Sequence, residues 1–539
     1  MPRICVVVFL LAPVSCLWER SGGSQDCFTD AGTEEYCCDT ARHGPLGCDE
    51  CWEEGRTYED CCLVPQEDPC NWEKVQSQLG SSPGATKVFA SLSDMHFEDR
   101  AFVMETVRSG CCSHYHVTEC WNNSSSIFDM SSDYVQCCFP KLVGMLRSPP
   151  PTWLRDEIQR ATNGRRESSP GALDAFEQQC SLISEGMGDG RGRGAFCRIQ
   201  MCRGHVTVQT SCNISFMAGG TSNLDRDTDV HGYLEAFVRA LHILRDLAQD
   251  SLEVDMFISV QDMVMHNYSV PVASFNSYLE TPDVMLLPAE WQLTSVAQRY
   301  YRKITLLDTI PWDEKLPVVF WRGGLGAAHS FWSSGQDQPP DVPMNCKLED
   351  QFHQRAFNAS NWYWHPRGRL CLLSTYSSDV DAKITNLNAL RQIPEDQAAS
   401  VQRTLERAGL WSRGHPVEDF LKYKYLIIPD ISDRLYYLSW INAVLFIPKS
   451  AVKQWGMSLL QPWKHYIPLE HDLGDLVAKI AWAQSHQEAC RRIAAQASAL
   501  SRHIFSPDVS LLYLYHLLKS QEVSSGACNR DTRFNDREG

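Results

Sequence analysis

The segment from residue 422 to residue 476 constrains the fold of this chain more than any other. An apolar run at 423–428 leads into a polar turn that ends at Arg434, and a second apolar run at 443–447 leads into the turn PWKHYIP. Short apolar runs joined by polar turns are typical of buried strands in an α/β sheet. Such sheets bind ligands at their carboxyl edge, so this order predicts a nucleotide-sugar site there.

Helices and strands alternate upstream and downstream of this segment. Apolar residues recur at helical spacing over 231–247, 473–504 and 509–518, while 254–260 and 316–321 are short apolar runs. The segment that carries this pattern is too long to fold around a single hydrophobic core. We therefore expect two α/β domains that face a cleft, at 153–310 and 311–525, followed by a tail at 526–539.

The N-terminus indicates the cellular compartment. Arg3 precedes an apolar run at 4–14, which fits a signal peptide over 1–22 and is shorter than the roughly 20 residues that a spanning helix needs. An uncleaved anchor is the alternative. No later stretch approaches transmembrane length, so we expect the lumen of the ER or Golgi, or secretion.

The cysteine content agrees with an oxidising compartment. The chain has 23 cysteines, and the densest region, 23–147, repeats a pattern of vicinal cysteines followed by a single cysteine and an aromatic residue. We interpret this region as a small disulfide-rich module without a large core, and zinc binding through Cys48 and Cys51 is the weaker alternative. Candidate glycosylation sites are Asn122, Asn123, Asn213, Asn267 and Asn358.

Two further sequence features concern a domain boundary and the class of partner. The prolines after Ser148 predict a semi-rigid linker at 148–152. The formal net charge of −17 argues against a nucleic-acid partner, because phosphate backbones attract clustered Lys and Arg. An anionic nucleotide would then need a local basic pocket.

Several of these motifs together resemble one enzyme family. KYKYLI, the turn at Arg434, QPWKHYIPLEHDLGDL and the upstream FWRGG are similar to glycosyltransferase family 90, which includes protein O-glucosyltransferases and a capsule-associated xylosyltransferase. The likeness spans about 153–521 and is clearest over 422–518. It implies a GT-B fold, an inverting transfer from UDP-glucose or UDP-xylose, and no metal or other cofactor.

An inverting transferase needs a general base that deprotonates the acceptor hydroxyl. Asp262 follows the apolar run at 254–260, so its carboxylate is expected at a strand's carboxyl end, and the resemblance places the base at this position. The alternative is that Asp262 caps the following segment. Asp255 and Asp283 are the next candidates.

The departing diphosphate needs guanidinium groups or backbone N–H donors. We expect Arg434 to bind it, together with the backbone of Asp430, Ile431, Ser432 and Asp433, although acidic residues stand where the family often has small ones. Arg322, Gly323 and Gly324 allow close backbone approach at a second strand end. The resemblance matches Arg369 to a further donor-binding arginine, and His465 is either beside the nucleotide or a packed turn residue.

Two D-x-D triplets, at 225–227 and 379–381, are of the kind that hold a divalent cation, but neither follows the apolar strand that such ligands need. We therefore expect no metal site. The sequence favours a glycosyltransferase that transfers glucose or xylose to a protein serine or a glycan hydroxyl. The alternative is a secreted cysteine-rich binding protein with a degenerate transferase domain.

Overall fold

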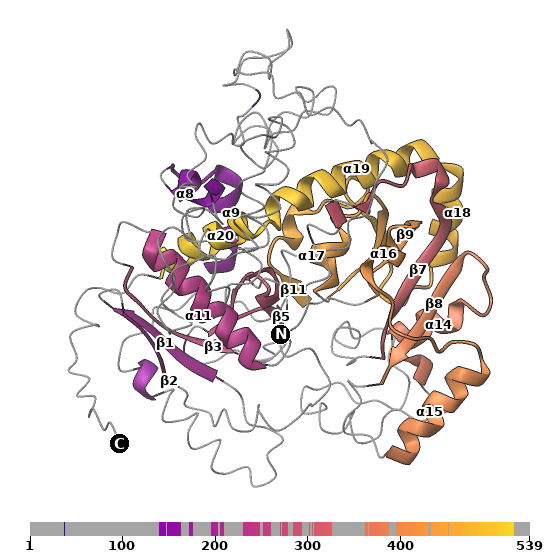
Figure 1. Ribbon diagram of the computed structural model, residues 1–539, viewed down its shortest axis with the longest axis horizontal. Coiled ribbons are helices and arrows are strands. Elements are labelled where there is room, and N and C mark those ends of the chain that lie inside the picture. The colour runs from indigo at the N-terminus through magenta and orange to yellow at the C-terminus, as the bar shows by residue number, and fades with distance from the viewer. Residues whose placement is uncertain are drawn as a thin grey trace, which may run out of the picture. The chain divides into compact units, whose positions relative to one another are not determined.

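Figure 1 shows the computed structural model. Residues 1–64 and residues 65–539 form two units, and all the elements discussed below belong to the second unit. The structure describes residues 37, 140–146, 148–162, 172–175, 196–202, 205–209, 230–247, 252–259, 270, 272–278, 284–293, 301, 304–305, 307–325, 362–364, 366–387, 395–429, 433–450 and 452–521. The predicted glycosylation sites and most of the cysteine-rich region lie outside these residues.

A five-stranded, entirely parallel sheet forms the centre of the C-terminal half. Its order is β12-β10-β9-β7-β8, built from β7 (Leu316–Gly324), β8 (Val380–Asn386), β9 (Tyr423–Ile427), β10 (Val444–Pro448) and β12 (Ile467–Leu469). Every residue of β10 is buried, whereas exposure alternates along the edge strand β8. This difference is expected because a central parallel strand is covered on both faces and an edge strand is less protected.

Helices cover this sheet and complete its core. Helices α14 (Pro366–Leu373), α18 (Leu476–Ser485) and α19 (Gln487–Ile504) contribute Leu370, Ile480 and Ala494 to the same buried cluster as Trp321 of β7. Helix α15 (Glu395–Arg407) buries only Val401 and Leu405, consistent with its strongly polar sequence. The predicted helical region 473–504 is therefore two helices, which are separated at His486.

The N-terminal half contains a second five-stranded sheet, but it is mixed. Its order is β2-β1-β3-β4-β6, from β1 (Phe196–Cys202), β2 (His205–Gln209), β3 (Val254–Ser259), β4 (Val272–Ser274) and β6 (Val284–Leu286). Strands β3, β4 and β6 are parallel, while β1 runs antiparallel to both of its neighbours. The predicted Rossmann-like character thus applies to part of this sheet, next to the predicted helix α11 (Val230–Leu247).

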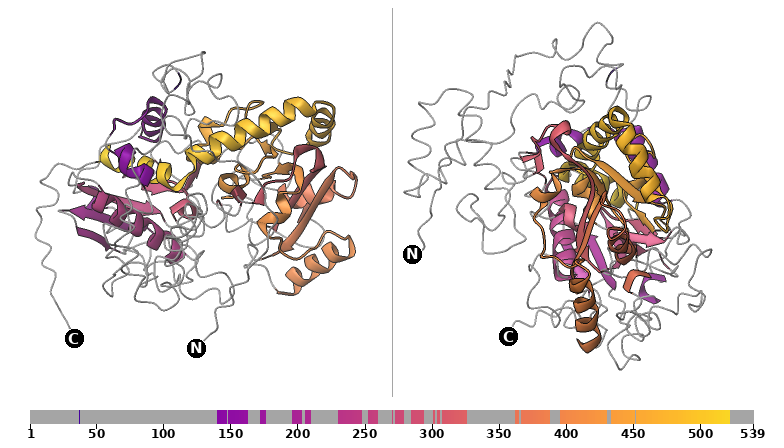
Figure 2. Two further views of the ribbon diagram at one scale, coloured as in Figure 1. Left: turned by 45° about the horizontal axis from the view of Figure 1, so that its top comes forward. Right: turned by 90° about the vertical axis from the view of Figure 1, so that its right-hand side faces the viewer.

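The last helix, α20 (Pro507–Lys519), returns to the N-terminal half. It contacts α8 (Pro140–Leu146), α9 (Thr152–Thr162) and α11, and the hydroxyl of Tyr513 donates to the Leu286 carbonyl of β6 at 2.8 Å. Both views in Figure 2 show the yellow end of the chain beside the purple helices. The predicted second domain, 311–525, includes residues 507–519, and the packing of these residues connects the two halves of the chain.

A buried ion pair secures the start of β7. Lys315 Nζ lies 2.7 Å from Asp308 Oδ1 and donates to the Asn442 carbonyl at 2.8 Å, while the Asn442 N–H donates to Asp308 Oδ2 at 2.6 Å. The two side chains are 0% and 1% exposed. Burial lowers the pKa of Lys315 and the Asp308 carboxylate opposes that shift. The chain before β7 is thereby attached to the chain before β10.

His516 of α20 should make the protein sensitive to acid. Burial, followed by the charge of Lys519, lowers the pKa of His516 to about 4. Between pH 6.5 and 4 the unfolded chain then binds more protons, so the free energy of unfolding falls as the pH falls through this window. We expect a loss of roughly 2 kcal/mol after allowance for partial exposure.

The His516→Gln variant tests this expectation. Denaturant unfolding at pH 7 and pH 4.5 should show a smaller pH effect in the variant than in the wild type. An equal loss of stability in both proteins would assign the acid sensitivity to other groups.

Among the residues that the structure describes, no helix combines the length and apolar character required to span a membrane.

Candidate functional site

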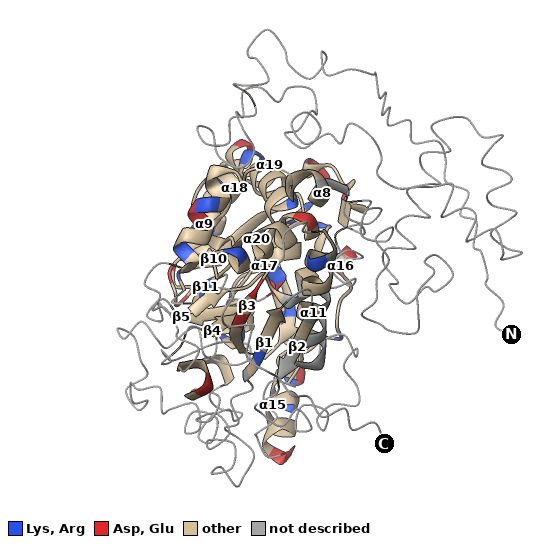
Figure 3. Ribbon diagram, turned by 90° about the vertical axis from the view of Figure 1, so that its left-hand side faces the viewer, with Lys and Arg blue, Asp and Glu red and all other residues tan. Residues whose placement is uncertain are grey.

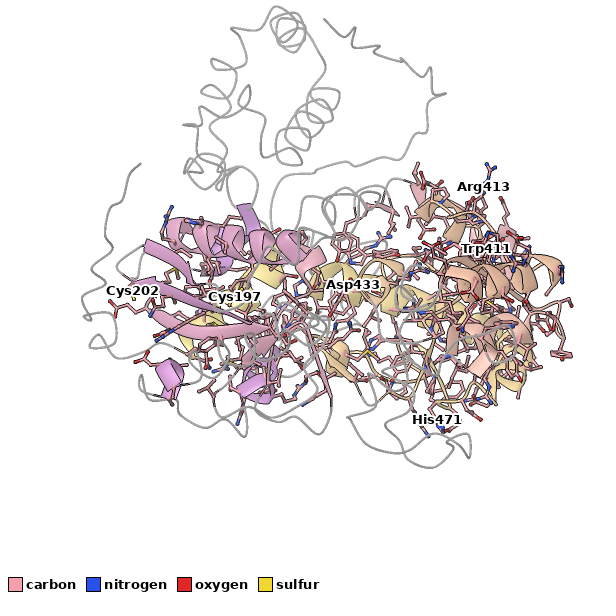
Figure 4. All side chains as sticks on the ribbon, turned by 90° about the horizontal axis from the view of Figure 1, so that it is seen from below. Cys197, Cys202, Trp411, Arg413, Asp433 and His471 are labelled. Carbon is pink, nitrogen blue, oxygen red and sulfur yellow. The ribbon has the colours of Figure 1, made fainter. Side chains whose placement is uncertain are left out.

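The order of the parallel sheet locates the site. The chain leaves β7 toward β8 on one side and reaches β9 on the other side, so the strand order reverses between β7 and β9. Ligands of open α/β sheets bind at such a switch point, outside the carboxyl ends of the strands. Arg322, Gly323 and Gly324 occupy the end of β7, and Asp433 and Arg434 follow β9, so the structure brings these predicted residues to one edge (Figure 4 labels Asp433).

Arg434 is held in place by β7. Its Nη1 donates to the Arg322 carbonyl, and its guanidinium carbon lies 5.8 Å from the centre of the Trp321 ring. A Cβ on Gly323 would lie 3.1 Å from Arg434 Nη2 and 2.6 Å from the Trp321 ring. Glycine is therefore required at position 323 because protein side chains pack against it.

Gly324 has a comparable role. A Cβ there would lie 2.4 Å from Asn386 Oδ1, at the end of β8, and β7 has a register shift between Gly323 and Gly324. Arg367, in the first turn of α14, donates to the Gly324 carbonyl at 3.0 Å. The sequence predicted a strand interrupted at Arg322; instead β7 continues to Gly324, and the glycines accommodate neighbouring side chains.

Arg322 has partners within the protein. Its Nη2 donates to both carboxylate oxygens of Asp381 at 2.8 Å, and its Nη1 donates to the carbonyls of Trp321 and Asp381. The residue is 7% exposed. These hydrogen bonds fix Arg322 at the end of β7. Contact between Arg322 and a sugar donor stays a prediction.

The other predicted residues lie in different places. Arg369 donates to the Asp472 carbonyl at 3.0 Å, beyond β12, so Arg367 is the α14 arginine that reaches β7. His465 is buried, and its Nδ1 accepts from the Gln461 N–H at 2.9 Å, as expected for a packed turn residue. Asp262, Asp283 and residues 430–432 lie outside the described residues, so their roles stay predictions.

Three carboxylates considered from the sequence, those of Asp255, Asp379 and Asp381, have partners within the protein. Arg198 Nε and Nη2 donate to the two oxygens of Asp255 at 2.8 Å each, within the N-terminal sheet. In the triplet at 379–381, Asp379 accepts from Gln484 and Asp381 accepts from Arg322. Among the described residues, no group of three or more His, Cys, Asp or Glu side chains is arranged to hold a metal ion.

A cavity of about 410 Å³ opens at the same edge of the sheet, beside β9, β10 and β12. Its walls include Ile428, Pro429 and Leu435, which flank the turn that leads to Arg434, and Glu157 and Arg160 of α9. Burial raises the pKa of Glu157, and its hydrogen bonds with Ser458 and Arg160 oppose this shift. Local sequence patterns do not reveal this cavity, because its walls come from segments about 300 residues apart, as in the Ser458–Glu157 contact.

The fold and the edge geometry define an α/β domain with a topological switch point at the carboxyl edge of its parallel sheet. Comparison with known sequences makes the assignment specific, because residues 350–522 match the model of glycosyl transferase family 90. This part of the chain is therefore a glycosyl transferase family 90 domain, as the motifs indicated.

Individual relatives match shorter stretches. The chain is 40% identical to protein O-glucosyltransferase 2 of Danio rerio over 103 residues, which is 19% of this chain and 20% of the relative. It is 32% identical to protein O-glucosyltransferase 3 of Mus musculus over 104 residues, or 19% and 21% of the two chains. It is 22% identical to the uncharacterized protein 179R of invertebrate iridescent virus 6 over 229 residues, which is 40% of this chain and 17% of the viral protein. The chain thus spans about a fifth of the length of these relatives.

Proposed function

We propose that this protein is an inverting, metal-independent glycosyltransferase that moves glucose or xylose from a UDP-sugar to a protein serine or a glycan hydroxyl. The observation that carries the proposal is the position of Arg434 at the β7/β9 switch point of a family 90 domain. A guanidinium at this edge suits the negative charge that develops on a departing diphosphate.

The residues near this edge support chemistry without a metal. Arg434 and Arg367 bring two fixed positive charges to the end of β7, where a metal-free transferase needs them. Asp379 and Asp381, which the sequence offered as possible metal ligands, instead hold Gln484 and Arg322. In this proposal Asp262, beyond the end of β3, is the general base that accepts the proton of the attacking hydroxyl.

The proposal places the enzyme in the secretory pathway and gives it a GT-B arrangement of two α/β domains. Cys37 and Cys202 are each disulfide-bonded, which suits an oxidising compartment. The return of α20 to the N-terminal half and the antiparallel pairing of β5 (Asn276–Tyr278) with β11 (Val452–Gln454) connect the two halves of the chain, which supports a two-domain arrangement.

A binding protein with a degenerate transferase domain is the second candidate. The ion pair between Arg322 and Asp381 favours it, because this guanidinium has its preferred partner inside the protein. The acidic residues Asp430 and Asp433 also favour the binding protein.

An assay of the full chain with UDP-glucose and UDP-xylose separates the two candidates. We expect UDP release in the wild type, and a decrease of about 10³-fold in kcat for Asp262→Asn, because the amide cannot accept the proton. No turnover with either donor would contradict the transferase proposal. Full activity of the variant would contradict only the assignment of the base.

A further inference from the structure

Two tryptophans and a histidine form an aromatic cluster at the end of α18, outside the candidate site. The rings of Trp463 and Trp482 meet edge to face with their centres 4.9 Å apart, and Trp482 stacks on His486 at 4.6 Å with an interplanar angle of 10°. Trp463 is 45% exposed, and His486 is exposed as well. Single exposed apolar residues are ordinary, whereas an exposed cluster often marks a binding surface.

The turn that carries Trp463 holds this residue in a strained backbone conformation. Its φ is 65°, in the left-handed region that a bulky side chain rarely adopts. The Trp463 N–H donates to the Tyr466 carbonyl at 2.7 Å. The His465 N–H donates to the Gln461 carbonyl, and His465 Nδ1 accepts from the Gln461 N–H, both at 2.9 Å. Strain that several hydrogen bonds maintain is typical of functional positions, and here it keeps an indole at the surface.

The cluster lies at the amino edge of the parallel sheet, whereas Arg434 follows the carboxyl end of β9. Trp463 precedes β12. Near the end of α18, Gln484 Nε2 donates to the Pro317 carbonyl at 3.5 Å and to Asp379 Oδ1 at 3.0 Å, and these two residues lie at the amino ends of β7 and β8. The cluster is therefore separate from the switch point at the carboxyl edge.

Charged groups around the cluster are paired with opposite charges. Lys479 Nζ lies 4.4 Å from the centre of the Trp463 ring and 3.7 Å from Asp475 Oδ2. In the first turns of α19, Arg492 Nη1 lies 3.4 Å from Glu488 Oε1. Figure 3 shows basic and acidic segments together near the label of α19. These pairs favour an uncharged ligand over a phosphate or an acidic polymer.

We propose that the cluster of Trp463, Trp482 and His486 binds a neutral, β-linked glucan or xylan type of glycan by stacking on its pyranose rings. The hydroxyls of such rings are equatorial, so each face presents axial C–H bonds that carry partial positive charge. The faces of aromatic rings carry the complementary negative charge. Ser485 Oγ lies 3.0 Å from His486 Nδ1 at the exposed rim, and this oxygen can accept from a sugar hydroxyl.

The size of the cluster favours a sugar over a protein partner. A stable protein interface buries about 800 Å² on each partner around an apolar core. Here two indoles and one imidazole are bordered by polar side chains, among them those of Gln461, Lys479 and Ser485. Such a platform matches one or two pyranose rings. The inference goes beyond the proposed function, because this edge can hold a glycan whether or not sugar transfer occurs at the opposite edge.

Titration of the full chain with cellohexaose, followed by saturation-transfer NMR, tests the inference. The wild type is expected to bind, and Trp463→Ala should lower the affinity about tenfold, because a stacking ring is lost. Trp463→Tyr retains a ring and should lose less. Tyr376→Ala is the matched control, because it removes an aromatic residue of the same half that is 80% exposed, and it should leave the affinity unchanged. No binding by the wild type, or equal affinity in Trp463→Ala, would overturn the inference.

Two further variants separate glycan binding from folding and from the candidate site. Trp463→Gly removes the ring but suits a positive φ, so its thermal midpoint should be at least that of Trp463→Ala while its cellohexaose affinity is equally low. Arg434→Ala should retain the wild-type affinity, because Arg434 lies at the carboxyl edge. A destabilised Trp463→Gly with wild-type affinity would show that the ring only supports α18 and would contradict the inference.

Two other measurements distinguish this inference from its competitors. Sedimentation of the full chain should show the same oligomeric state in the wild type and Trp463→Ala; a dimer that depends on Trp463 would assign the cluster to self-association and overturn glycan binding. In the transfer assay, cellohexaose binding without sugar transfer would retain the aromatic site and contradict the enzyme. Sugar transfer without glycan binding that depends on Trp463 would retain the enzyme and contradict the aromatic site.

Discussion

Replacing Arg434 with alanine is expected to lower kcat for transfer by about 10² to 10³-fold, the usual cost of removing one preorganised donor at a site of developing charge. The reason is the position of the guanidinium, which the Arg322 carbonyl and the Trp321 ring fix at the switch point. A fixed charge stabilises the leaving diphosphate more than a mobile one, because no reorganisation is needed during the reaction. Steady-state kinetics with UDP-sugars measure the effect.

The design of this experiment includes two controls. Arg434→Lys retains the charge but loses the planar fork, so its activity should lie between that of alanine and the wild type. Arg413→Ala removes a more exposed arginine of the same half and should leave kcat unchanged. If Arg434→Ala retained full activity, the diphosphate would have to bind at another part of the edge.

The second large effect concerns stability. Lys315→Met leaves the Asp308 carboxylate buried without its cation, and breaking such a pair typically costs 3–5 kcal/mol, so we expect a loss of about 4 kcal/mol. The Asn442 N–H still donates to Asp308, but one neutral donor does not replace a charge. Denaturant unfolding of the full chain measures the change.

Matched variants show whether the buried charge is responsible. Lys422→Met removes another lysine that pairs with an aspartate, but its side chain is 55% exposed, so the loss should be below about 1 kcal/mol. The double variant Lys315→Met with Asp308→Leu should lose less than Lys315→Met alone, because it leaves no buried charge unpaired. A double variant less stable than the single one would indicate that packing rather than charge dominates.

Local patterns predicted the central elements well. The apolar runs at 423–428 and 443–447 became β9 and β10, and the helical pattern at 231–247 became α11, because buried strands and amphipathic helices leave direct traces in the sequence. The end of β7 was harder to predict. Glycine usually ends a strand, but here neighbouring side chains fill the space at Gly323 and Gly324, and β7 continues.

The candidate site was only partly predictable. Arg434 was found because it follows an apolar strand, whereas the partner of Arg322 could not be inferred, because Asp381 lies 59 residues away on a strand whose neighbour is set by topology. Similarly, Arg367 and Arg369 are two residues apart, and only the direction of α14 shows which one reaches β7.

By itself, the sequence determined the α/β character of the C-terminal half, the likeness to family 90 and the placement of Arg434 after a strand, since these features depend on residues near one another in the chain. Only the tertiary structure decided the strand order, the switch point between β7 and β9, the pairing of Arg322 with Asp381 and the cavity beside β9, β10 and β12. These features depend on contacts between distant segments, and strand pairing is not encoded in local periodicity.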